Sequence, residues 1–187
     1  MAKQFDHLGA DHISFIADQP IYFVATAPET GRLNLSPKGM DSLRVLTPSR
    51  LIWLNLTGSG NETAPHLAAD PRITLMWCSF GIRPMILRAY GTARALHQNH
   101  KDWAALLAQL PNQPGARQIV DVTIDLVQSS CGYAVPQMDL TAERPVLRDW
   151  AINKGTDGVA TYWATRNTNT IDGRPTGIEA NLPESQS

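Results

Sequence analysis

Short segments rich in apolar and β-branched residues, separated by turn residues, recur through the first 130 positions, and in RLNLSPKG apolar and polar residues alternate with a period of two. This alternation is typical of strands with one buried and one solvated face. The short connections between the segments favour antiparallel pairing. In the last segment the parity of the apolar positions shifts, which indicates a β-bulge. The predicted strands are IYFVATA, RLNLSPKG, LRVLT, RLIWLNLT, RITLMWC, MILRAYGTARAL and RQIVDVTIDLVQSSC.

Apolar positions with helical spacing predict helices around this sheet. Residues 7–19 predict an amphipathic helix that ends before Pro20, and residues 99–110 predict another with one apolar face. TGSGNETAPHLAADP predicts a tight loop that leads into a short helix. Two further helices are predicted within a C-terminal extension at about 139–170. From Gly173 onward the tail has little to bury, so it is expected to be frayed.

About seven antiparallel strands with peripheral helices predict a mainly β fold, a Greek-key-like barrel. No stretch is long and flexible enough to act as an interdomain linker, so the chain is expected to form a single domain over 1–187. Strand–helix–strand alternation is absent, and GSGNET has the wrong spacing for a GxGxxG dinucleotide motif.

Composition excludes several classes of partner. The chain has 187 residues, 43% of them hydrophobic, and 16 basic against 17 acidic side chains for a net charge of −1. We therefore expect no nucleic-acid or membrane-surface partner. MAKQFDHLGADH lacks an apolar signal core, which favours a cytoplasmic protein with Cys78 and Cys131 as free thiols. The five histidines form no ligand set with a carboxylate or thiol, so no metal site is expected.

The segment RLNLSPKG raises the first functional question. Asn34, Ser36 and Lys38 share one face of the predicted strand, and Leu33 and Leu35 share the other. The polar face could simply be solvated. It could also form a wall for a flat, polar-edged and anionic ligand.

The segment TGSGNET, residues 57–63, raises a second functional question. Glycines allow close backbone approach to a ligand, and unpaired N–H groups at a helix start suit a phosphate. The same segment is also typical of an ordinary helix cap, with Ser59 or Asn61 capping and no ligand bound.

With these blocks together, the chain resembles the FMN-binding split-barrel proteins related to pyridoxamine 5'-phosphate oxidase. The resemblance covers nearly the whole chain in order. Its pieces are IYFVATA, NLSPKGMDSLRVL, LTGSGNETAPHL, RITLMWC, ILRAYGTA, SSCGYAVP and RNTNTIDG.

The resemblance implies a homodimer with one FMN per subunit in clefts between two split β-barrels. The second strand would meet the flavin's pyrimidine edge, and the loop at 59–63 would hold the phosphate. Arg88 and the region from Cys131 to Val135 would approach the flavin from the same chain or its partner. The implied cofactor-binding residues are Asn34, Leu35, Ser36, Lys38, Gly39, Thr57, Ser59, Gly60, Asn61, Glu62, Thr63 and Arg88.

One departure from the family stands out. The oxidases proper have an Arg-Lys pair at the start of this helix, where this chain has Glu62 and Thr63. A glutamate beside a phosphate is unfavourable unless it points away or pairs with a base such as Lys38 or Arg44. Pyridoxamine phosphate is therefore not the expected substrate.

The function expected from the resemblance is flavin-dependent oxidoreduction of a small molecule, with self-association and a small-molecule substrate or electron donor as the partners. The alternatives are a non-catalytic flavin, haem or deazaflavin carrier or sensor, and a cofactor-free interaction module. No side chain is singled out as catalytic. Trp53 and Trp77 are predicted core residues, while Trp150 and Trp163 could cover the cofactor cleft or pack in a dimer. Polar groups of RNTNTIDG are expected to fix the C-terminus against the barrel.

Overall fold

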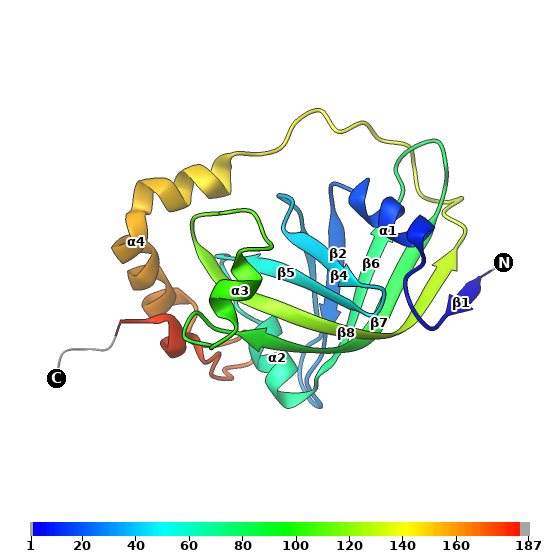
Figure 1. The fold of residues 1–187 in the computed structure, drawn as a ribbon. Helices are drawn as coiled ribbons and strands as arrows, with labels where there is room; N and C mark the ends of the chain where they lie inside the picture. The colour runs from blue at the N-terminus through cyan, green and yellow to red at the C-terminus, as the bar shows by residue number, and fades with distance from the viewer. Residues whose placement is uncertain (1, 184–187) are drawn as a thin grey trace.

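A computed structural model describes residues 2–183 of the chain. One antiparallel sheet of eight strands dominates it, with strand order β3-β2-β6-β7-β8-β5-β4 and with β1 paired to β8. The predicted mainly β fold with peripheral helices, a split barrel, is confirmed (Figure 1). The strands are β1 Lys3–Phe5, β2 Tyr22–Thr26, β3 Asn34–Lys38, β4 Leu43–Thr47, β5 Arg50–Leu56, β6 Arg72–Cys78, β7 Ile86–Leu96 and β8 Ala116–Ser130. The helices are α1 Ala10–Ala17, α2 Thr63–Ala69, α3 Trp103–Leu107, α4 Val146–Arg166 and the 3-10 helix η1 Ile178–Asn181.

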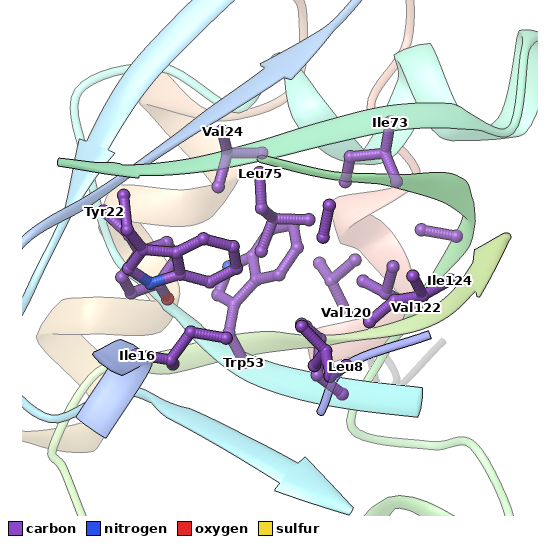
Figure 2. Packing of buried hydrophobic residues seen from close by; sticks show 14 of the residues in the cluster. Leu8, Ile16, Tyr22, Val24, Trp53, Ile73, Leu75, Val120, Val122 and Ile124 are labelled. Carbon is purple, nitrogen blue, oxygen red and sulfur yellow. The ribbon is translucent and has the colours of Figure 1, made fainter. Parts of the chain in front are cut away.

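The main core fills the inside of the curled sheet. Side chains from β2, β5, β6, β7 and β8 meet there, and α1 adds Ile16 (Figure 2). Trp53 and Trp77 are fully buried, as predicted, and Trp77 stacks on Tyr22 with ring centroids 6.1 Å apart. A second apolar cluster lies where α3 packs against β5 and β8.

The bulge predicted in the last long strand is present. Tyr90 pairs with Leu126 while Gly91 pairs with Ile124, so Asp125 is the extra residue. A Cβ at Gly91 would lie 2.0 Å from the carbonyl oxygen of Thr123, so only glycine allows this close approach of β7 to β8.

The helix predicted at 99–110 is shorter than expected. Only Trp103–Leu107 is α-helical. After it, the N–H of Gln109 bonds to Leu106 O and that of Leu110 to Leu107 O, the tighter i to i+3 pattern of a 3-10 turn. Leu106 and Leu110 still pack on the sheet, so the apolar face was identified correctly and the helix length was not.

The C-terminal part forms a compact unit beside the barrel. Gly155, with φ 65° and ψ 173°, divides α4 into two helical halves, close to the two predicted helices. A long segment of residues 131–145 crosses one end of the barrel to reach α4 (Figure 1). Within residues 2–183, no helix has both the length and the apolar run needed to cross a bilayer.

The expectation of a frayed tail is wrong for residues 173–183. Ile178 is fully buried against Trp163, and Asn181 donates to the carbonyl oxygen of Arg117. Asp172 also pairs with Arg32, which agrees with the predicted anchoring by RNTNTIDG. One buried isoleucine and a few polar anchors hold a segment whose composition is typical of a loose tail. Residues 184–187 lie outside the described part.

Candidate functional site

Strand β3 turns its polar face into the molecule and its leucines outward. Asn34, Ser36 and Lys38 are half-buried, whereas Leu33 is 81% and Leu35 68% exposed. Because β3 is an edge strand, Pro37 leaves no central ladder bond unmade. The polar face is therefore not solvated, which was one of the two readings of this strand.

Lys38 begins a chain of hydrogen bonds that runs into the barrel wall. Its Nζ donates to Asn55 Oδ1 at 3.4 Å, Asn55 Nδ2 donates to Gln118 Oε1 at 2.8 Å, and Gln118 Nε2 donates to Asn61 Oδ1 at 3.2 Å. Burial and, to a smaller extent, the positive charge of Arg117 together lower the pKa of Lys38 to about 8. Every donor in the chain points the same way, so Asn61 Nδ2 is left at the end without a partner.

Arg117 is a second buried cation. It is 3% exposed, and its Nη1 donates to Gly60 O at 2.9 Å and to Asn167 Oδ1 at 2.7 Å. Burial lowers its pKa to about 10. Among residues 2–183, neither Arg117 nor Lys38 has a carboxylate within ion-pair distance.

The loop between β5 and α2 is held by hydrogen bonds to Gly115, Trp163 and Asn167. Thr57 Oγ1 accepts from Trp163 Nε1 at 2.8 Å and donates to Gly115 O, and Asn167 Nδ2 donates to Gly58 O at 3.1 Å. Gly58 and Gly60 do not have positive φ, and a Cβ on either would meet nothing closer than 3.5 Å. These glycines are therefore not required by backbone strain or by packing within the chain, and they leave open space beside the loop.

A cavity of about 940 Å³ opens beside this loop. Of the predicted cofactor-binding residues, Lys38, Gly39, Thr57 and Ser59 line it. Its other walls come from the α1–β2 turn, from Phe80 and Gly81, from residues 138–147, and from Trp150 and Tyr162 of α4. Trp150 and Tyr162 pack edge to face with centroids 5.1 Å apart. Sequence reasoning considered Trp150 but missed Tyr162 and Phe80, because their distance along the chain gives no sign that they meet.

The remaining predicted residues lie outside this lining. Asn34 Nδ2 donates to Thr63 Oγ1 at 3.3 Å, which ties β3 to the start of α2. Glu62 Oε1 accepts from the N–H of Ile171 at 3.1 Å, so its carboxylate faces the C-terminal segment and pairs with neither Lys38 nor Arg44. The others in this group are Leu35, Ser36, Gly60 and Asn61, and Ser36 Oγ is buried without a partner.

Arg88 and the two cysteines are also placed away from the cavity lining. Arg88 Nη1 lies 3.4 Å from Ser130 Oγ on the neighbouring strand β8. Cys131 is exposed, whereas Cys78 is buried and burial raises the pKa of its thiol. Within the described residues, no three His, Cys, Asp or Glu side chains gather as potential metal ligands.

Comparisons with known proteins agree with this architecture. The family model described as "Pyridoxamine 5'-phosphate oxidase" matches residues 9–131. A curated relative from Aspergillus flavus, "Pyridoxamine 5'-phosphate oxidase family protein ustO", is 36% identical over 177 residues, which cover 84% of this chain and 70% of that protein.

Solved structures show the same fold at lower identity. A putative pyridoxamine 5'-phosphate oxidase from Lactobacillus delbrueckii is similar with a TM-score of 0.54 and 22% identity, covering 66% of this chain and 94% of that one. Group A Streptococcus HupZ is similar with a TM-score of 0.52 and 18% identity, covering 65% and 98%. Both matches cover about two thirds of this chain.

Proposed function

The chain belongs to the pyridoxamine 5'-phosphate oxidase family, and from this premise we propose that it binds FMN beside Lys38 and acts as a flavin-dependent oxidoreductase on a small molecule. A bound flavin would supply hydride or electron transfer, while the protein supplies orientation, charge and shelter from water. The cavity of about 940 Å³ is within the range of about 300–1,000 Å³ that is usual for cofactor sites.

The observation that carries this proposal is a pair of cations, the half-buried Lys38 and the buried Arg117, that have no carboxylate partner among residues 2–183. Lys38 lines the cavity, and Arg117 lies behind the adjoining loop, where it bonds to Gly60 O. Burying an unpaired charge costs several kcal/mol as an order of magnitude, so a chain that keeps two such charges is expected to use them. A phosphate dianion at the cavity wall would offset both.

The loop and the aromatic wall fit the rest of the cofactor. The open space beside Gly58 and Gly60 allows close approach of a ligand, and the exposed Ser59 hydroxyl is available as a donor. Trp150 and Tyr162 present apolar surface on another wall, which suits a planar ring and excludes water from it.

The first turn of α2 fits less well. Glu62 already accepts a hydrogen bond from Ile171, and its negative charge would oppose a phosphate there. We therefore place the phosphate on the Lys38 and Ser59 side of the loop. In this arrangement the loop binds the phosphate, and the seven-residue helix α2 does not contribute to the binding.

The charges around the cavity argue against a second phosphorylated ligand. Besides Lys38, its charged lining consists of Arg144 and three carboxylates, those of Asp18, Asp139 and Glu143. If Lys38 binds the phosphate of the cofactor, the remaining charged side chains of the lining are one arginine and three carboxylates, which would repel a second phosphate. The substrate is therefore not a vitamer phosphate such as pyridoxamine phosphate.

We also propose that the protein is a two-fold homodimer. Leu33 and Leu35 are exposed on an edge strand, and such a hydrophobic edge is normally covered. The interface should bury roughly 2,000 Å² or more in total. Light scattering should give twice the chain mass of 20.5 kDa at micromolar concentration, and a monomer at that concentration would contradict the proposal.

The flavin proposal is tested by reconstitution. Purified protein is stripped of any bound ligand, titrated with FMN and monitored by quenching of flavin fluorescence. Saturable binding of one FMN per chain is expected, followed by reduction by NADH or NADPH and reoxidation with turnover. Binding without turnover would favour the carrier or sensor alternative, a haem spectrum would favour a haem protein, and absence of binding would refute the proposal.

A further inference from the structure

We propose that the C-terminal unit holds the loop at 57–61 in a phosphate-binding conformation, with Asn167 as its positioning residue. This inference rests on the proposed function, because the ligand in question is the phosphate monoester of FMN. Asn167 lies beyond residues 9–131, which the family model matches. It is fully buried, and its side-chain amide donates to Gly58 O in the loop.

Three buried side chains fasten the loop, two of them at the end of α4 and one in β8. Asn167 uses both ends of its amide, because Nδ2 donates to Gly58 O and Oδ1 accepts from Arg117 Nη1. Arg117 Nη1 in turn donates to Gly60 O. Trp163, one turn earlier in α4, donates to Thr57 Oγ1. One asparagine therefore fixes two loop carbonyls, the first directly and the second through the guanidinium.

The direction of the carbonyls determines the direction of the neighbouring N–H groups. In a trans peptide, the C=O of one residue and the N–H of the next point in opposite directions, and the described chain has no cis peptide. With the carbonyls of Gly58 and Gly60 turned toward Asn167 and Arg117, the N–H groups of Ser59 and Asn61 point away from the C-terminal unit. Among residues 2–183 no acceptor is found for either N–H. Two free amides on the same side of one turn can donate to the same anion, and we call this pair, the N–H groups of Ser59 and Asn61, the nest.

An unpaired buried group provides a second, independent indication of a ligand at this loop. Within the described residues, Asn61 is 1% exposed, yet its Nδ2 has no partner. Buried donors are rarely left unpaired in folded proteins. Asn61 belongs to the loop itself, so an anion bound there would give its Nδ2 an acceptor.

The nest would give the site its preference for a phosphorylated ligand. Riboflavin has the same ring as FMN but no phosphate, so the ratio of the two affinities isolates the part of the binding that the nest supplies. A residue that only stabilises the fold would change both affinities together. A residue that positions the nest would lower that of FMN alone.

The experiment compares the dissociation constants of FMN and riboflavin for the full-length protein and its variants. Asn167→Ala should weaken FMN binding about tenfold or more, the loss typical of a charge-assisted hydrogen bond, and leave riboflavin binding within about twofold. Asn167→Asp keeps the acceptor for Arg117 but loses the donor to Gly58 O, so its affinity for FMN should lie between those of wild type and Asn167→Ala. Asn169→Ala, at an exposed neighbouring position, is the matched control and should bind as wild type does.

A second pair of variants tests the nest without disturbing the C-terminal unit. Ser59→Pro removes the N–H, whereas Ser59→Ala keeps it and removes only the hydroxyl. The proline variant should reproduce the selective loss of FMN affinity, and the alanine variant should lose less. Equal loss for FMN and riboflavin in the Asn167 variants, or an unchanged ratio in Ser59→Pro, would overturn the inference. Absence of flavin binding by wild type would instead refute the proposed function itself.

Discussion

Replacing Lys38 with methionine should make the ligand-free protein more stable and its flavin binding weaker. Methionine keeps the length and apolar body of the side chain and removes the charge. A lowering of the Lys38 pKa from 10.5 to about 8 corresponds to a penalty of about 3 kcal/mol for the charged form at neutral pH. The variant also loses the hydrogen bond to Asn55, which is already long at 3.4 Å, and this loss offsets about 1 kcal/mol of the gain in stability. The expected net gain in the free energy of unfolding is about 2 kcal/mol.

The pH dependence of this gain has a definite sign. Between about pH 8 and pH 10.5, the unfolded chain binds the Lys38 proton and the folded chain does not. The stability of the wild type therefore rises with pH across this window, relative to the variant. The advantage of Lys38→Met should be full below about pH 8 and be lost by about pH 10.5, where the missing hydrogen bond leaves the variant about 1 kcal/mol less stable than the wild type. Comparing the two proteins at each pH cancels the titration of every group they share.

Urea unfolding of the ligand-free proteins measures this difference. FMN titration of the same samples should show a loss of about tenfold or more, as expected for removal of a charge-assisted hydrogen bond. Lys101→Met, at an exposed position, is the control and should change stability by no more than about 0.5 kcal/mol. A Lys38→Met protein that is less stable at pH 7, or one that binds FMN as tightly as wild type, would refute the reasoning.

Two further substitutions test the fold. Gly91→Ala should destabilise by about 3 kcal/mol or more, because its Cβ would lie 2.0 Å from Thr123 O, and a thermal unfolding midpoint close to that of wild type would show that β7 and β8 do not approach so closely. Ile178→Ala should cost about 2–4 kcal/mol and expose the C-terminal segment to limited proteolysis, while Ile171→Ala, at a 73% exposed position, should do neither. Equal protease resistance of the two isoleucine variants would mean that the tail is held by its polar contacts alone.

The strands could be predicted because apolar segments bounded by turn residues are typical of strands, with a two-residue period of burial in β2 and continuous burial in β5. Strand β3 is instructive. In β3 the leucines face out and Ser36 and Lys38 face in, which is the direction that the family resemblance implied and that the period alone does not give. Which face of a strand is buried depends on the residues that pack against it in the fold. For β3 these include Asn55 and Thr63, residues that the sequence does not mark as its neighbours.

The site was predicted in part for the same reason. Lys38 and Ser59 lie in local segments with their own polar signals, and both line the cavity. Tyr162 is brought to it by the path of the chain after β8, which no local pattern encodes. Arg117 lies near the start of β8 and contacts the loop rather than the cavity. The tail was misjudged because its docking depends on Ile178, a single buried side chain in a polar segment.

Gly155 has a consequence for engineering this protein. Its φ of 65° and ψ of 173° are accessible almost only to glycine, so the break in α4 is fixed by this one residue. Before the break, Trp150 belongs with residues 138–147 as a wall of the cavity, and after it Trp163 is committed to Thr57 and the loop. The halves meet where Trp150 packs on Tyr162, which also lines the cavity. Libraries aimed at a new substrate should vary residues 138–147 and leave Trp150 and 157–167 untouched, so that changes in what the cavity admits do not disturb how the loop is held.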